Sequence, residues 1–135
     1  MIEKYMTPPS FTKRFPIELF FDFERHLSKR DALIAQMIYL SYFNLTRILN
    51  LKVGEIEIEV GVAYIGIDYY LCKFPERSIG WLKQIMDEKE PYDLLFCNRN
   101  GEKVDRSRIY RSFSNAGLKV TPPLKITPSM LCELH

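Results

Sequence analysis

The sequence predicts a mainly helical α+β domain with a three-stranded antiparallel sheet. Apolar residues recur at helical spacing on both sides of residues 55–74, whereas inside that stretch the pattern changes to one typical of strands. The chain has 135 residues, of which 47% are hydrophobic, so it can bury one substantial core. We therefore expect residues 1–15 to form an N-terminal arm and residues 16–135 to form one domain.

Two helices are expected in the first part of the domain. Pro16 suits a first helical position, and residues 17–27 carry apolar side chains at helical spacing. Ser28 followed by Asp31 resembles a capping box, and residues 31–51 are apolar almost all round. We expect this second segment to be a helix at the centre of the domain.

Three short strands are predicted next. Residues 55–60 alternate glutamate with apolar side chains, and Gly61 is a turn signal. The runs 62–67 and 69–74 are rich in β-branched and aromatic residues. Short links between consecutive strands most simply give an antiparallel meander, whose glutamates then face water.

Helices are predicted again after Pro75. Apolar residues at helical spacing return at residues 79–86, and residues 98–101 form a turn sequence. Asp105 can cap a further helix, with Gly117 as its C-terminal stop.

A last helix is expected to begin at Thr127-Pro128. On the helix after Asp105, Arg108, Arg111 and Asn115 fall opposite the apolar stripe.

Composition argues against a metal site, a cofactor and a membrane span. The cysteines form no CxxC pair, and few histidines could join them as ligands: Cys72, Cys97 and Cys132, with His26 and His135. The longest apolar stretch, residues 32–51, is interrupted by polar side chains, and no signal-peptide pattern opens the chain. We expect a cytoplasmic protein with reduced thiols. The net charge of +2 is too small to argue for or against nucleic acid.

Short motifs follow one another at residues 30–33, 48–53, 62–75, 94–101 and 126–128. In this order they resemble the catalytic domain of tyrosine recombinases, the phage-integrase family. Residues 30–33 and 48–53 look like its "RDxxL … LLxLKxxDI" stretch. Residues 62–75 resemble its second and third strands, residues 94–101 its "LF…nG" stretch, and residues 126–128 the start of its "TPHxLRH" helix. The resemblance covers about residues 16–135 and implies that family's fold.

The resemblance also implies a chemistry for which this chain lacks the residues. The family transfers a phosphoryl group to a tyrosine, using arginines, a lysine and a histidine. The matched positions hold other residues: Asn44, Tyr70, Ser129 and Cys132. The nucleophilic tyrosine would fall beyond His135, so we expect a C-terminally truncated scaffold without catalytic residues.

Basic residues make DNA the first candidate partner. Residues 99–125 hold seven Lys and Arg against two acidic residues, in a region that lies near DNA in the family. The candidates for DNA contact are Arg47, Lys73, Arg99, Lys103, Arg106, Arg108 and Arg111. The alternative is a solvated helix face without a ligand.

Three functions therefore stay open. The first is a catalytically inactive domain that binds double-stranded DNA or modulates an active recombinase. The second is a protein-interaction module or oligomerising scaffold without DNA binding. The third is a fragment of a recombinase that lacks its tyrosine. No small-molecule cofactor or membrane is expected in any of them.

Overall fold

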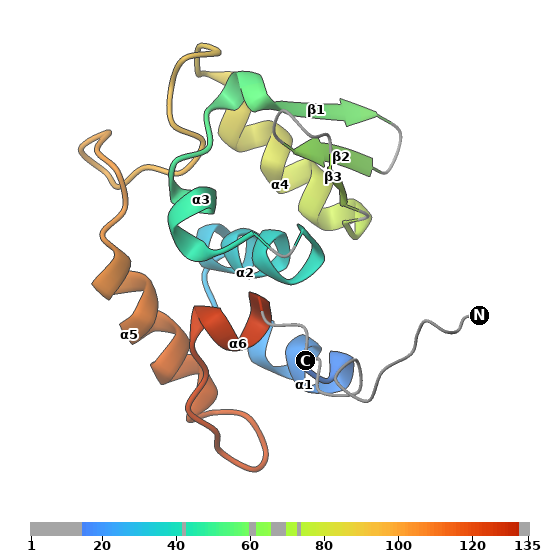
Figure 1. Cartoon of the computed structure of the whole chain (residues 1–135), viewed down its shortest axis with the longest axis vertical. Coiled ribbons are helices and arrows are strands. Elements are labelled where there is room, and N and C mark those ends of the chain that lie inside the picture. The colour runs from blue at the N-terminus through green and yellow to red at the C-terminus, as the bar shows by residue number, and fades with distance from the viewer. Residues whose placement is uncertain (1–14, 42, 60–61, 66–69, 73, 133–135) are drawn as a thin grey trace.

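The computed structural model describes residues 15–41, 43–59, 62–65, 70–72 and 74–132. Figure 1 shows α2 at the centre, with the sheet and α4 on one side of it and α1, α5 and α6 on the other. The helices are α1 (Ile17–Glu24), α2 (Lys29–Ser41), α3 (Leu45–Leu49), α4 (Glu76–Asp87), α5 (Arg106–Gly117) and α6 (Pro128–Cys132), and a short 3-10 helix spans Val53–Glu55. The strands are β1 (Ile56–Glu59), β2 (Val62–Ile65) and β3 (Tyr70–Cys72).

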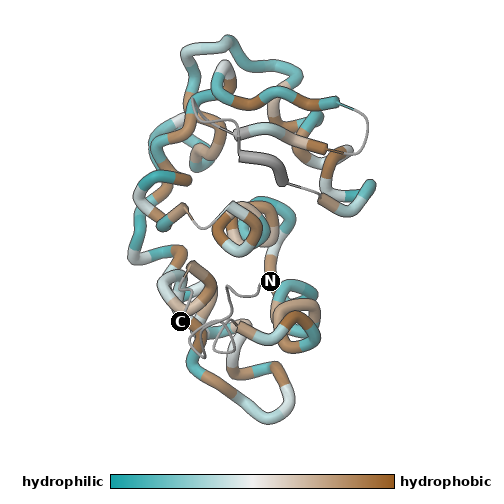
Figure 2. The backbone as a smooth tube through the Cα atoms, turned by 45° about the vertical axis from the view of Figure 1, so that its right-hand side comes forward, coloured by the Kyte–Doolittle hydropathy of each residue, from teal (hydrophilic) through white to brown (hydrophobic). Residues whose placement is uncertain are grey.

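The central position of α2 follows from its composition. Its side chains are buried from Asp31 through Tyr39, because a helix that is apolar on all sides needs neighbours on all sides. Figure 2 shows this helix near the middle of the molecule, with other parts of the chain above and below it. Aromatic contacts join the neighbouring helices: Phe20 stacks on Tyr39 at 4.3 Å between ring centroids, and Phe23 meets Phe113 edge to face at 5.1 Å.

The expectation of one helix over residues 31–51 is wrong, because the chain leaves the helix after Ser41 and re-enters it at Leu45. Two side chains take over backbone hydrogen bonds at the break. The Ser41 hydroxyl accepts from the backbone N–H of Phe43 at 3.1 Å, and the Asn44 side chain accepts from the N–H of Arg47 at 2.9 Å. Such local acceptors compete with the helical hydrogen-bond pattern and favour a helix end followed by a new N-cap.

The antiparallel meander is confirmed, with the strand order β1-β2-β3. Glu57 lies opposite Tyr64, and Ala63 lies opposite Cys72. Glu57 and Glu59 are exposed, as the alternating pattern predicts. β1 begins at Ile56, one residue later than predicted, and Phe74 lies outside β3. Other parts of the predicted runs 55–60, 62–67 and 69–74 lie outside the described residues.

The predicted N-terminal arm, residues 1–15, also lies outside the described residues, apart from Phe15. Phe15 is buried, and its carbonyl accepts a hydrogen bond of 2.6 Å from the Tyr39 hydroxyl. Phe15 therefore packs with the domain rather than with the predicted arm. No helix in the described part of the chain is both long enough and apolar enough to cross a membrane.

Gly117 has a different role from the predicted helix stop. It belongs to α5, and Leu118 caps the helix in a right-handed conformation. A Cβ at residue 117 would overlap the carbonyl oxygen of Leu124 and lie 3.2 Å from the backbone nitrogen of Ile126. The Leu124 N–H donates to the Gly117 carbonyl at 2.9 Å. Glycine is therefore needed because two backbone segments approach closely.

Candidate nucleic-acid interface

A groove of about 920 Å³ lies where the start of α2, the turn at residues 98–101 and the start of α5 meet. We call it the basic groove, because its charged side chains are four cations and one carboxylate. Its lining residues are Ser28, Lys29, Arg30, Asn98, Arg99, Asn100, Asp105 and Arg108. Two regions far apart in the sequence, residues 28–30 and residues 98–108, thus supply one cationic surface.

Arg30 is held in the groove by a buried carboxylate. Its Nε donates to Asp31 at 2.9 Å, and the other oxygen of Asp31 accepts from the Ser112 hydroxyl at 2.6 Å. Asp31 is only 5% exposed, and its N–H donates to the side chain of Ser28, 3.2 Å away. These contacts tie the first turn of α2 to α5, so Arg30 and the basic residues of α5 keep a defined spacing.

The turn that carries Arg99 is closed by Asn98 and Gly101. The Asn98 side-chain oxygen accepts from the N–H groups of Asn100 at 2.9 Å and Glu102 at 3.0 Å. Gly101 has φ of 79°, a conformation that favours glycine. Arg99 is exposed on this turn, so its guanidinium can reach a ligand in the groove.

Asp105 starts α5 as predicted. One carboxylate oxygen accepts from both the N–H and the hydroxyl of Ser107, each at 3.0 Å. These two hydrogen bonds lower the pKa of Asp105, and the charges of Arg111 and Arg108 act in the same direction. The carboxylate of the basic groove is therefore ionised at neutral pH and orders the helix end that presents Arg108.

This lowered pKa predicts a pH-dependent stability. Because the folded-state pKa lies below the ordinary value of 3.8, the ionised group stabilises the fold above that pH and loses this effect on acidification. We expect the stability difference between the wild type and Asp105→Asn to shrink as the pH falls from about 5 to about 3. Urea unfolding at several pH values measures it, and a difference that stays constant would contradict the assignment.

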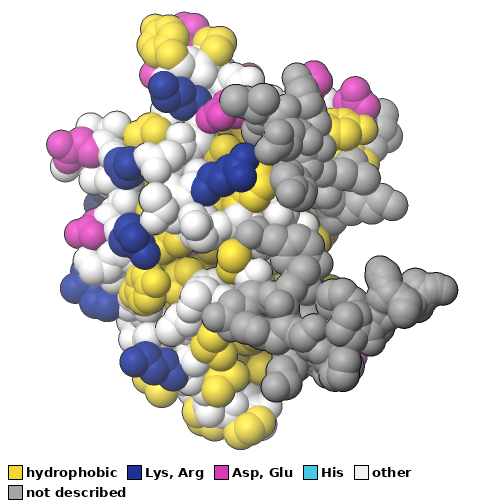
Figure 3. All heavy atoms as spheres, in the orientation of Figure 1, with side chains coloured by type: hydrophobic (Ala, Val, Ile, Leu, Met, Phe, Trp, Pro, Cys, Tyr) yellow, Lys and Arg dark blue, Asp and Glu magenta, His cyan; other side chains and the backbone are white. Residues whose placement is uncertain are grey.

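The predicted DNA-contact residues divide into groups. Arg99 and Arg108 lie in the basic groove. Lys103 and Arg111 are exposed, and Arg111 follows Arg108 by about one turn of α5. Arg106 lies elsewhere on the helix, with its guanidinium 6.0 Å from the ring centroid of Tyr110. Figure 3 shows Lys and Arg side chains along the edge of the molecule formed by α5.

Two groove cations, Lys29 and Arg30, were absent from the predicted set. The sequence carried a signal for them, since Arg30 and Asp31 open the recombinase-like "RDxxL" segment. It gave no indication that this segment would meet the turn of Arg99. Predicted Lys73 lies outside the described residues, so its relation to the groove stays a prediction.

The positions matched to catalytic residues carry no cation among the described side chains. Asn44 is exposed and caps α3. Ser129 is exposed, with its hydroxyl 3.2 Å from that of Thr127, and Cys132 is half-buried against the core. Tyr70 pairs with Ile65 in the sheet, and its side chain is not described.

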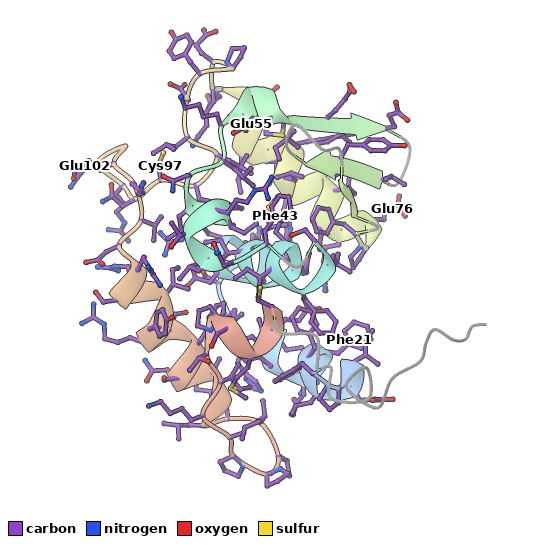
Figure 4. The ribbon with its side chains drawn as sticks, in the orientation of Figure 1. Phe21, Phe43, Glu55, Glu76, Cys97 and Glu102 are labelled. Atoms are coloured by element: carbon purple, nitrogen blue, oxygen red, sulfur yellow. The ribbon has the colours of Figure 1, made fainter. Side chains whose placement is uncertain are left out.

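Arg47 lies apart from the residues that line the basic groove. It is exposed on α3, and its guanidinium carbon is 3.7 Å from the centroid of the Phe43 ring. Figure 4 shows Phe43 near the middle of the molecule, beside α2 and α3. The helix that Asn44 caps thus carries a cation that stacks on an aromatic ring. In the described part of the chain, no three His, Cys, Asp or Glu side chains gather closely enough to hold a metal ion.

Comparison with known proteins connects the chain to recombinases. No family model matches it. The virulence plasmid integrase pGP8-D of Chlamydia trachomatis is 25% identical over 114 residues, a match that covers 79% of this chain. The corresponding protein of Chlamydia muridarum is also 25% identical over 114 residues. The match covers 34% of either integrase, so this chain spans about a third of their length.

Solved structures agree on the fold. XerA recombinase superposes with a TM-score of 0.68 at 16% identity, over 88% of this chain and 47% of that one. XerH site-specific recombinase bound to palindromic difH substrate, in a post-cleavage complex, gives a TM-score of 0.65 at 21% identity, over 89% of this chain and 39% of that one. The chain therefore has the fold of a tyrosine recombinase catalytic domain, and it is related in sequence to a plasmid integrase.

Proposed function

We propose that this chain is a catalytically inactive, tyrosine-recombinase-like domain that binds double-stranded DNA through its basic groove. The observation that carries the proposal is that Lys29, Arg30, Arg99 and Arg108 line one groove, whose only carboxylate among its lining residues is Asp105. Cations clustered in this way match a phosphate backbone, whose release of counterions on binding drives association. The XerH relatives were solved bound to difH substrate, which supports DNA as the partner.

The proposed lack of catalysis rests on the matched positions. Asn44 and Ser129 offer neutral side chains, and Cys132 offers a thiol, where the family places arginine and histidine. A neutral amide or hydroxyl stabilises the charge on a phosphoryl transition state less than a guanidinium does. Loss of one preorganised group of this kind costs about 10² to 10³ in rate, so the combined losses should abolish strand cleavage.

Fluorescence anisotropy with a mixed-sequence duplex tests the binding proposal. We expect affinity to fall steeply with salt, and Arg30→Ala plus Arg108→Ala to reduce the slope of log K against log[salt] by about 2. Arg106→Ala is the matched control, because it removes a cation from the same helix as Arg108 but outside the groove. We expect it to change the slope less.

Three results would argue against the proposal. A native chain that binds no duplex at low salt removes the DNA function. Equal reductions of the salt slope by the groove pair and by Arg106→Ala would mean that DNA responds to the overall charge of α5 rather than to the groove. Nicking of a supercoiled plasmid by the purified chain, absent in a variant without Arg47, would contradict the proposed inactivity.

A further inference from the structure

A second pocket lies away from the basic groove, and its walls are mainly apolar. It encloses about 310 Å³ between α1, α2 and the residues that precede α4. Its lining residues are Ile17, Phe20, Phe21, Glu24, Gln36, Tyr39, Leu40, Phe74 and Pro75. Two of them are unusually exposed for their type, Ile17 at 50% and Phe21 at 51%. Figure 4 labels Phe21, which lies on α1 and lines this pocket.

Two polar side chains contribute acceptors to this apolar pocket. Glu24 is 9% exposed and Gln36 is 3% exposed. The Gln36 amide nitrogen donates to the Glu24 carboxylate at 2.7 Å, whereas the Gln36 amide oxygen is buried with no hydrogen-bond partner. An unsatisfied buried acceptor and a buried carboxylate are both unfavourable, and both are stabilised by a hydrogen-bond donor with positive charge.

Three cations of the chain lie near Glu24 and Gln36 without forming an ion pair with Glu24. Arg25, Lys29 and Arg77 line a smaller pocket that also touches Glu24 and Gln36. Arg25 pairs with Asp22 at 2.8 Å, while Lys29 and Arg77 lie 5.5 and 5.1 Å from the ring centroid of Trp81. Within the described residues, the ion pairs found do not include Glu24. The Glu24 carboxylate and the unpartnered Gln36 oxygen are therefore available as acceptors for an added cation.

We propose that this pocket binds an arginine, flanked by apolar residues, from a segment of a partner protein. A guanidinium is planar and carries five donors, so it can bond the Glu24 carboxylate and the Gln36 oxygen together. The methylenes of the arginine would lie along the aromatic walls, and its apolar neighbours would cover Ile17 and Phe21. This site does not depend on DNA binding, because it shares no lining residue with the basic groove.

A short peptide probe tests the site by NMR. We expect N-acetyl-Leu-Arg-Leu-amide to shift the backbone amide signals of Phe20, Tyr39 and Leu40 but not those of Arg99 and Arg108. The same peptide with citrulline in place of arginine is the control, since citrulline keeps the shape and loses the charge. Glu24→Gln should weaken binding about tenfold or more, because it removes a charged acceptor.

A second variant tests the pocket at an exposed residue, because Glu24→Gln changes a buried side chain and can affect folding. Phe21→Ser alters the exposed rim without touching the buried pair, and it should also weaken peptide binding while leaving duplex affinity unchanged. Equal binding of the arginine and citrulline peptides would overturn the proposal. A further variant, Lys13→Gln with Arg14→Gln, removes the two cations that most closely precede α1 in the sequence. Absence of peptide binding to both the native chain and this variant would also overturn the proposal. Peptide binding to this variant alone would show that the pocket takes a cation of its own chain, which overturns the proposal of a partner protein.

Discussion

Replacing Gly117 with alanine is expected to lower the free energy of unfolding by about 2–3 kcal/mol, within the range for overpacked sites. The added Cβ would overlap the carbonyl oxygen of Leu124, which is backbone and cannot rotate away. The hydrogen bond of 2.9 Å from the Leu124 N–H to the Gly117 carbonyl would be strained by the same displacement. Urea denaturation followed by circular dichroism measures the change.

Gly80 supplies the matched control for this prediction. It lies exposed within α4, and a Cβ built there meets no atom within 4 Å. Gly80→Ala is therefore expected to stabilise the chain by about 0.5–1 kcal/mol through helix propensity and reduced freedom of the unfolded chain. If the two alanine variants had the same stability, the close approach of α5 to residues 124–126 would be wrong.

Asp31→Ala is expected to destabilise the chain by about 3 kcal/mol, because hydrogen bonds to a charged group contribute about 1.5–3 kcal/mol each when buried. Asp31 is 5% exposed and accepts from Arg30 on α2 and Ser112 on α5. Its loss also releases Arg30 from its place in the basic groove, so duplex affinity should fall in parallel. Denaturation and anisotropy together measure both effects.

Ser112→Ala separates the loss of stability from the loss of duplex affinity. It removes the contact from α5 but leaves the hydrogen bond between Arg30 and Asp31, so we expect a smaller loss of about 1 kcal/mol. In a double-mutant cycle, Asp31→Ala and Ser112→Ala should couple by about 1–2 kcal/mol. Additive effects would mean that the 2.6 Å hydrogen bond between their side chains contributes nothing to stability.

The basic groove and the apolar pocket suggest different partners for one scaffold. The groove combines cations from α2, the turn of Arg99 and α5, whereas the pocket combines aromatic walls with a buried carboxylate. A phosphate backbone fits the first, and a basic, apolar protein segment fits the second. If both proposals hold, this chain binds DNA on one surface and a protein segment on another.

Local sequence signals succeeded where the structure depends on neighbours along the chain. Asp105 caps α5, and the turn with Gly101 forms, because their hydrogen bonds stay within a few residues. The meander follows from the alternation in residues 55–60. The break after Ser41 was missed, although Ser41 and Asn44 are residues that end and begin helices, because hydrophobic periodicity continues through it.

The sequence by itself determined the fold class and the surplus of basic residues from Arg99 to Lys125. The matching of Asn44, Ser129 and Cys132 to catalytic positions stays a prediction. Only the tertiary structure decided which cations act together. Arg30 joins Arg108 through Asp31 and Ser112, 81 residues apart, whereas Arg106, two residues from Arg108, lies outside the groove. The physical reason is that periodicity places a side chain on a face of its own helix, and packing between helices then decides which faces meet.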